Sequence, residues 1–228
     1  YTDPIPFSKG TILCLKGDYP EGLSNGSRTV RFVLSGKVKA SGNIMSLIDN
    51  GACNTLTIPC NYCFKDLFRD CTSLITPPEL PATTLTSYCY QDMFYGCSSL
   101  TSAPELSATM LSNGCYDSMF GNCSSLIKAP ELPATTLASY CYNFMFIDCS
   151  SLVYPPELSA TTLADLCYTD MFGGCTSLVY PPTLPATVLS GYCYKSMFLG
   201  CKNLITAPEL PATTLTRECY NSMFYGCS

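Results

Sequence analysis

The side chains in this sequence best suited to chemistry are its cysteines, because most of the 17 fall into two columns that recur every 26 residues. The first column contains Cys63, Cys89, Cys115, Cys141, Cys167, Cys193 and Cys219, and the second contains Cys71, Cys97, Cys123, Cys149, Cys175, Cys201 and Cys227. Thiols so placed can fill a core, form disulfides or ligate a metal ion. We interpret both columns as structural.

The sequence leaves three possibilities for the chemical state of these thiols. Buried thiol columns that fill the corners of a repeated coil are the favoured interpretation. Disulfides within a repeat would require the intervening segment to leave the helical conformation, since eight helical residues span about 12 Å and a bridge allows about 7 Å between Cα atoms. The third state is zinc bound at the Cys60–Cys63 CxxC pair, near Cys53 and Cys71. Zinc ribbons need two such pairs, so we predict no metal and no cofactor.

A fixed period without insertions predicts a solenoid, in which each repeat is one coil stacked on the next. Six full units share the text CSSLxxxPELPATTLxxYCYxxMFxx, and a degenerate unit over 57–71 precedes them. We predict a β-rich cap or truncated β domain over 1–48, a degenerate first repeat or linker over 49–70, and six full repeats with a truncated seventh over 71–228.

Each unit is expected to contain a short strand and a short helix. The apolar spacing of Cys115, Met119 and Phe120 fits one face of a helix of about two turns, and the glycine that often follows this segment would end it. The run from Leu100 to Leu106 predicts a strand, which Pro104 makes irregular. The predicted fold is therefore an α/β, right-handed, leucine-rich-repeat-like stack.

Composition excludes several functions. The net charge of −5 and a pI near 4.6 disfavour binding to nucleic acid or to anionic lipid, and no apolar stretch is long enough to insert into a membrane. The chain has no histidine and no Gly-rich phosphate loop. Its carboxylates recur as a column, whereas acid–base catalysis needs two unequal ones. We expect no enzymatic activity.

At the junction of successive units the sequence resembles a known family. The run MFxxCxxL, for instance Met119, Phe120, Cys123 and Leu126, is similar to that of the BspA-like leucine-rich repeats of bacterial surface proteins. The resemblance covers about residues 57–228. It implies a curved leucine-rich-repeat solenoid that is secreted or displayed on the cell surface and acts in adhesion or ligand binding.

Binding residues are sought where the repeats differ. Position 128 and its equivalents beside the strand vary, and Lys128, Tyr154 and Tyr180 are the candidates there. Glu105, Glu131 and Glu157 belong to an acidic column that is either a solvated edge or a stripe for a basic ligand. The tyrosine column of CYxxMF is either core or a carbohydrate-stacking surface.

We expect a macromolecular partner, a protein or glycan on a host or neighbouring cell, bound in multivalent fashion. The alternative is a structural spacer or fibre segment with end-to-end self-association. Variation confined to one face would favour binding. However, the position of Gln91, Asp117 and Asn143 varies as much as the strand-side position does, so the sequence alone does not decide.

Overall fold

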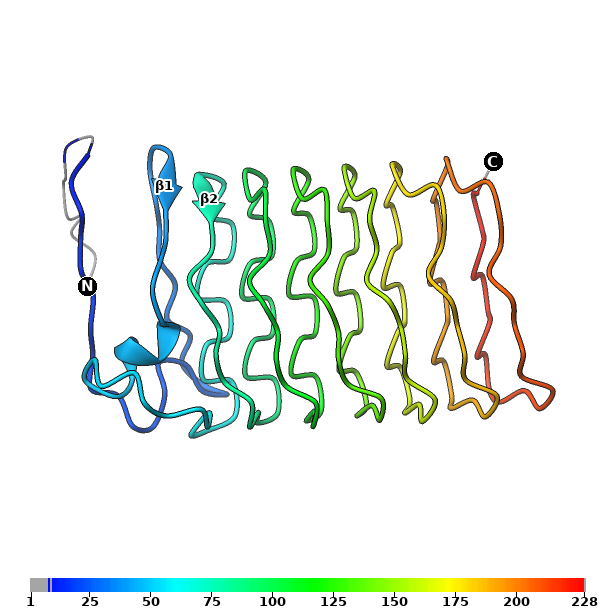
Figure 1. Ribbon diagram of the computed structural model, residues 1–228, viewed down its shortest axis with the longest axis horizontal. Coiled ribbons are helices and arrows are strands. Elements are labelled where there is room, and N and C mark those ends of the chain that lie inside the picture. Colours follow the sequence, from blue (N-terminus) through cyan, green and yellow to red (C-terminus); the bar gives the residue numbers. More distant parts are fainter. Residues whose placement is uncertain (1–7, 9, 228) are drawn as a thin grey trace.

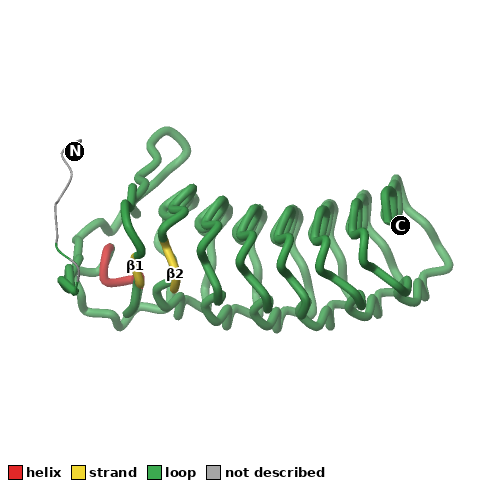
Figure 2. Tube along the Cα trace, turned by 90° about the horizontal axis from the view of Figure 1, so that it is seen from above, coloured by secondary structure: helices red, strands yellow, loops and turns green. Residues whose placement is uncertain are grey.

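The computed structural model describes residues 8 and 10–227, and Figure 1 shows them as a row of similar coils stacked along one axis. The predictions that concern residues 1–7, 9 and 228 lie outside this description. Within it, regular secondary structure is limited to strand β1 (Val38–Lys39), the 3-10 helix η1 (Ile44–Leu47) and strand β2 (Leu74–Thr76). β1 and β2 pair in parallel. A repeat stack is thus observed with almost no helix or strand, as Figure 2 shows by its colours.

The segment predicted to be helical is instead a ribbon of overlapping turns. In residues 114–123, Cys115, Asp117 and Met119 each donate a backbone N–H to the carbonyl three residues earlier. The residues between them donate to the next coil, for example Tyr116 N to Cys141 O at 3.1 Å and Phe120 N to Met145 O at 2.9 Å. We call this segment and its equivalents the turn ribbon: 62–71, 88–97, 114–123, 140–149, 166–175, 192–201 and 218–227.

The ribbon needs a residue with positive φ at every fourth position, and this requirement explains why no helix forms. Gly114, Ser118 and Asn122 have φ values of 58°, 56° and 59°. Glycine, asparagine and aspartate adopt this left-handed conformation at the lowest cost. The glycine expected to end a helix therefore belongs to the ribbon itself, in a column that contains only these three residue types: Asp70, Gly96, Asn122, Asp148, Gly174, Gly200 and Gly226.

The remaining part of each coil is extended but rarely forms a ladder. We call it the extended side: 72–87, 98–113, 124–139, 150–165, 176–191 and 202–217. Beyond β2, the described residues of neighbouring coils are joined on this side by isolated parallel bridges such as Lys128↔Tyr154 and Leu132↔Leu158, and by single backbone hydrogen bonds. Prolines such as Pro104 and Pro130 lack the N–H that a continuous ladder would need. A regular strand was predicted in every unit, but among the described repeats it is present only in the first full unit, as β2.

The core consists of side-chain columns that run through the stack. Tyr116 lies between Tyr90 and Tyr142 with ring centroids 5.9 Å from each, and the rings are nearly parallel. Phe120 stacks in the same way on Phe94 and Phe146, at 5.6 and 5.7 Å. These tyrosines are 1% exposed and the phenylalanines are fully buried. The tyrosine column is therefore core, and its interpretation as a carbohydrate-stacking surface is wrong.

An N-terminal segment covers the first turn ribbon. We call residues 17–34 the cap. Its Ser24 N donates to Cys63 O at 3.0 Å, and its Phe32 N donates to Leu67 O at 2.8 Å. The Phe32 ring extends the phenylalanine column onto Phe68 at 5.3 Å. Of the strands predicted before residue 48, the described residues contain only β1.

Candidate binding surface

Residues predicted to bind a ligand lie exposed on the extended side. Tyr154 and Tyr180 are 59% and 62% exposed. Tyr154 occupies the coil next to Lys128, with which it forms a β-bridge, and Tyr180 occupies the same position one coil farther along. Side chains at this position therefore form a row that follows the axis of the stack.

A groove of about 550 Å³ lies between two neighbouring coils on this side. Its lining includes Glu105 from one coil and Lys128 and Glu131 from the next, together with Ser102, Pro104 and Pro130. Three of the six predicted residues thus share one concave site. Tyr154, Tyr180 and Glu157 are not part of its lining, so the structure does not unite all six. No ion pair among Glu105, Lys128 and Glu131 is found in the part of the chain that the structure describes.

The sequence did not point to the aliphatic residues beside this row. Ile127 is 50% exposed and Val153 is 38% exposed, each one residue before Lys128 and Tyr154. They add apolar area next to the charged groove. The available signal in the sequence was that the buried leucine of these two units is followed directly by a second apolar residue, Ile127 or Val153. The surface can therefore combine charged, aromatic and aliphatic contacts, which is typical of sites for macromolecules.

The competing variable position, on the turn ribbon, is interior. Asp117, Asn143 and Thr169 are buried, and the Asp117 carboxylate accepts hydrogen bonds at 3.0 Å from both Gln91 Nε2 and Asn143 Nδ2. Burial raises the pKa of Asp117, while these bonds and one from Ser118 oppose the rise. Variation at this position in the middle coils therefore changes internal contacts and offers no surface for a ligand.

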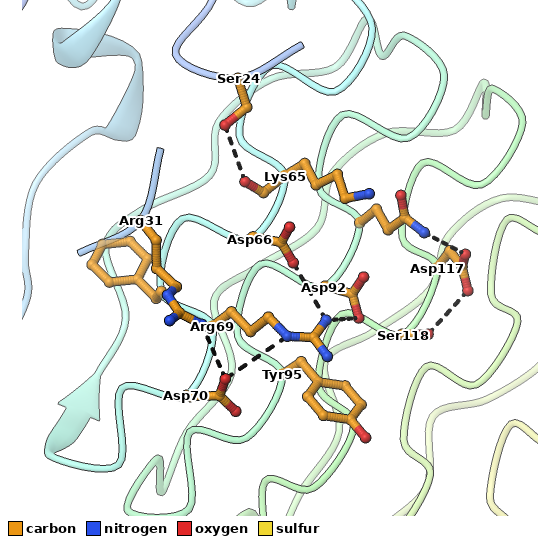
Figure 3. Close-up of polar contacts among 12 residues, drawn as sticks. Ser24, Arg31, Lys65, Asp66, Arg69, Asp70, Asp92, Tyr95, Asp117 and Ser118 are labelled. Atoms are coloured by element: carbon orange, nitrogen blue, oxygen red, sulfur yellow. Dashed lines mark hydrogen bonds and ion pairs between the residues drawn. The ribbon is translucent and has the colours of Figure 1, made fainter. Parts of the chain in front are cut away.

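A cluster of charges covers the ribbon of the first coils (Figure 3). Arg69 donates to Asp92 at 2.7 Å and to Asp66 at 3.3 Å, and its guanidinium lies 4.4 Å from the centre of the Tyr95 ring. Burial raises the pKa of Asp92 to about 6, although the charge of Arg69 acts against it. Because Arg69 in one coil pairs with Asp92 in the next, the cluster helps to fix neighbouring coils in register.

Both cysteine columns lie in the interior as free thiols, with the exception of Cys227 at the last coil, which is half-buried. In the second column each thiol donates to the carbonyl of a phenylalanine, which lies in the cap for Cys71 and in the preceding coil for the others, for example Cys123 Sγ to Phe94 O at 3.1 Å. Burial raises the pKa of Cys115 and of Cys149 to about 12. Thiols that remain protonated at neutral pH are weak nucleophiles, so from Cys89 onward these columns serve packing.

Neither a metal site nor a known relative adds to this description. Over residues 8 and 10–227 no group of three or more His, Cys, Asp or Glu side chains has the geometry to hold a metal ion, which includes the surroundings of Cys60 and Cys63. The same residues contain no helix of the length and apolarity that crossing a membrane requires. Comparisons with protein-family models, curated proteins and solved structures gave no match.

Proposed function

We propose that this chain is a non-enzymatic binding module whose extended side recognises a macromolecule. The observation that carries the proposal is the row formed by Lys128, Tyr154 and Tyr180. The row is exposed and variable, and it begins at a charged groove. It lies on a scaffold whose repeated cysteine, tyrosine, methionine and phenylalanine residues form the core. The row lets one linear ligand contact several coils at once, which raises affinity without any single strong site.

The ligand class that fits best is a glycan or glycosylated protein. Exposed tyrosine rings offer flat apolar faces and hydroxyl groups, and Glu105 and Glu131 supply acceptors for hydroxyl donors in the adjacent groove. The resemblance to BspA-like leucine-rich repeats supports a right-handed solenoid that acts outside the cell or at its surface. The complete burial of Met119, Phe120, Cys123 and Leu126, which carry that resemblance, is consistent with it.

Binding of the full chain to immobilised gastric mucin, measured by biolayer interferometry, tests this proposal, with fibronectin as a non-mucin protein probe. The test variant carries K128T, Y154T and Y180T, because threonine occupies this position at Thr76 and Thr206. The control is Val188→Thr, which changes another exposed residue to the type found at Thr162 and Thr214. We expect at least tenfold weaker mucin binding by the triple variant and no change in the control. Equal binding by all three proteins would contradict the assignment of this surface.

The alternative of a structural spacer also has one supporting observation. In the last coil the backbone N–H groups of Tyr220, Ser222 and Phe224 have no acceptor among the described residues, although their equivalents in earlier coils donate to the next coil. They could pair with a further coil. The carbonyls of the first ribbon, in contrast, already accept bonds from the cap. Head-to-tail stacking of two identical chains would therefore require the cap to leave, which disfavours this alternative.

A further inference from the structure

The first turn ribbon begins with a pair of thiols that no later coil contains. Cys60 lies three residues before Cys63, and its equivalents in the later units are Thr86, Ser112, Ala138, Ala164, Ser190 and Thr216. Where a hydroxyl is present it donates to a backbone carbonyl, as Thr86 Oγ1 does to Cys60 O at 2.6 Å. The fold thus requires only a small side chain here, so packing does not explain the thiol of Cys60.

The two sulfur atoms of this pair lie together. Both lie against Gly22 of the cap, and Cys60 Sγ donates to Glu21 O, also in the cap, at 2.8 Å. A Cβ placed on Gly22 would overlap Cys60 Sγ and would lie 2.9 Å from Cys63 Sγ. Both sulfur atoms therefore contact the same point of the cap, and glycine at position 22 leaves the space that they occupy.

The backbone brings the pair within bridging range. Tyr62 has a φ of 61°, close to the 58° of Gly114 at the equivalent position of a later coil. In that coil the turn is closed by Cys115 N donating to Ser112 O at 3.2 Å. The first and last residues of such a turn have Cα atoms less than about 7 Å apart, which overlaps the range of disulfides. The helix that would have separated these cysteines is absent.

We propose that Cys60 and Cys63 form a reversible dithiol–disulfide site that senses small-molecule disulfides and alters the contact between the first turn ribbon and the cap. This inference is independent of the ligand proposed for the extended side. Other buried thiols of the same column have no second sulfur beside them at this position, so the site is unique among the coils.

The order of the exchange follows from the surroundings of the two thiols. Burial raises the pKa of both thiols, far more for Cys63, and the neighbouring Cys63 side chain opposes the rise at Cys60. Cys60 is also the more accessible, so its thiolate attacks one sulfur of the oxidant, forms a mixed disulfide and releases one thiol. The Cys63 sulfur then attacks Cys60 Sγ and releases the second thiol. The protein loses two electrons and two protons, and these end on the two released thiols.

Closure of this bond changes the attachment of the cap. Cys60 Sγ no longer carries the hydrogen that it donates to Glu21 O. The backbone bonds next to it, such as Ser24 N to Cys63 O at 3.0 Å, join the same two segments and are the ones that will respond. Coils far from the cap have no part in this site.

The experiment uses the full chain with C14S and C53S, which remove the two exposed thiols. The protein is incubated with excess glutathione disulfide at pH 8, denatured, alkylated and analysed by peptide mass spectrometry. We expect the Cys60–Cys63 peptide to lose the mass of two hydrogen atoms and to escape alkylation. Cys89, with Thr86 three residues before it, should be alkylated in the same sample and is an internal control.

Cys60→Thr, added to this background, introduces the residue found at the equivalent positions Thr86 and Thr216, so it should fold. We expect Cys63 in this variant to remain free. Alkylation of both cysteines in the parent protein, or a stable glutathione adduct on Cys60, would overturn the disulfide. Hydrogen exchange provides the second readout. The Ser24 amide should exchange faster after oxidation while residues 140–149 are unchanged, and an unchanged Ser24 rate would overturn the link to the cap.

Discussion

The turn ribbon and the extended side of each coil share one period but are joined to the next coil in different ways. Along the ribbon every second N–H reaches the following coil, and this pattern recurs from 62–71 onward. On the extended side the described residues show fewer backbone bonds between coils, for example Thr101 N to Ile75 O, Val153 N to Ile127 O and Ile205 N to Val179 O. The ribbon therefore holds the stack in register, whereas the extended side can change its sequence at little cost.

The largest effect on the free energy of unfolding is expected from a substitution in the core behind the ribbon. Phe146 is fully buried and stacks on Phe120 at 5.7 Å and on Phe172 at 5.8 Å. Phe146→Ala leaves a cavity and interrupts the column, so we expect a loss of about 3–5 kcal/mol in the free energy of unfolding. Urea unfolding followed by far-UV circular dichroism measures it. A loss below about 1 kcal/mol would show that the ribbon does not depend on its core.

Next in size is the effect of filling a left-handed position. Gly174 has a φ of 72°, and an added Cβ would overlap the Asp148 carboxylate. Gly200 has a φ of 70°, and an added Cβ there would meet only Gly174 N, at a contact distance of 3.9 Å. Gly200→Ala should cost about 1–2 kcal/mol from the backbone alone. Gly174→Ala should cost more because Asp148 must also move. Thermal unfolding of the two variants compares them directly, and equal losses would argue against the contact with Asp148.

A smaller effect on the ribbon depends on pH. Burial raises the pKa of Asp170 to about 6, against the opposing charge of Lys195. A raised folded-state pKa means that the protonated carboxyl favours the native state, so this stabilisation is complete below the ordinary pKa and is lost as pH rises through about 6. Asp170→Ser, which introduces the residue found at the equivalent positions Ser118 and Ser196, should therefore stabilise the protein at pH 7 relative to pH 4. Solvent screening of this half-buried group limits the gain to less than about 1 kcal/mol.

The Asp170 prediction is checked by urea unfolding of both proteins at the two pH values. The quantity to compare is the difference between variant and wild type, which cancels the titration of the other carboxylates. A difference that is the same at pH 4 and pH 7, or larger at pH 4, would contradict the stated cause.

The smallest expected effect lies on the extended side. Tyr154 is exposed and takes part in no buried contact of the core, so Tyr154→Thr should change the free energy of unfolding by less than about 0.5 kcal/mol. The same variant should weaken binding to mucin. Measuring both quantities separates the two sides, since a destabilised Tyr154 variant would show that the extended side also holds the stack together.

The sequence predicted the period, the stacked units and the burial of the cysteine columns, because a strict repeat imposes the same environment on equivalent residues. It did not predict the turn ribbon. The spacing of Cys115, Met119 and Phe120 fits a helix and also fits overlapping turns, which place equivalent residues every four positions. The distinguishing signal was the restriction of the column of Asp70, Gly96 and Asn122 to residues that tolerate positive φ.

The candidate site could be predicted only in part, because variation between the repeats marks buried positions as well as exposed ones. Variation drew attention to Lys128, Tyr154 and Tyr180, which the structure exposes, and equally to Asp117 and Asn143, which it buries. A variable residue can lie in the interior when its neighbours along the column vary with it, as Gln91 and Asn143 do around Asp117. Variation alone cannot separate these cases, because it carries no information on which way a side chain points.

The tyrosine column also gives the protein an optical property. The chain contains no tryptophan, and the rings of Tyr90, Tyr116 and Tyr142 lie nearly parallel with centroids 5.9 Å apart. At such separations excitation energy passes readily from one phenol to the next before emission. Because the rings are nearly parallel, this transfer preserves the direction of polarisation, so emission from the column in the intact stack should remain polarised. Polarisation should fall wherever a coil separates from its neighbour and its ring turns out of line. Intrinsic fluorescence anisotropy thus reports on the continuity of the stack without any attached label.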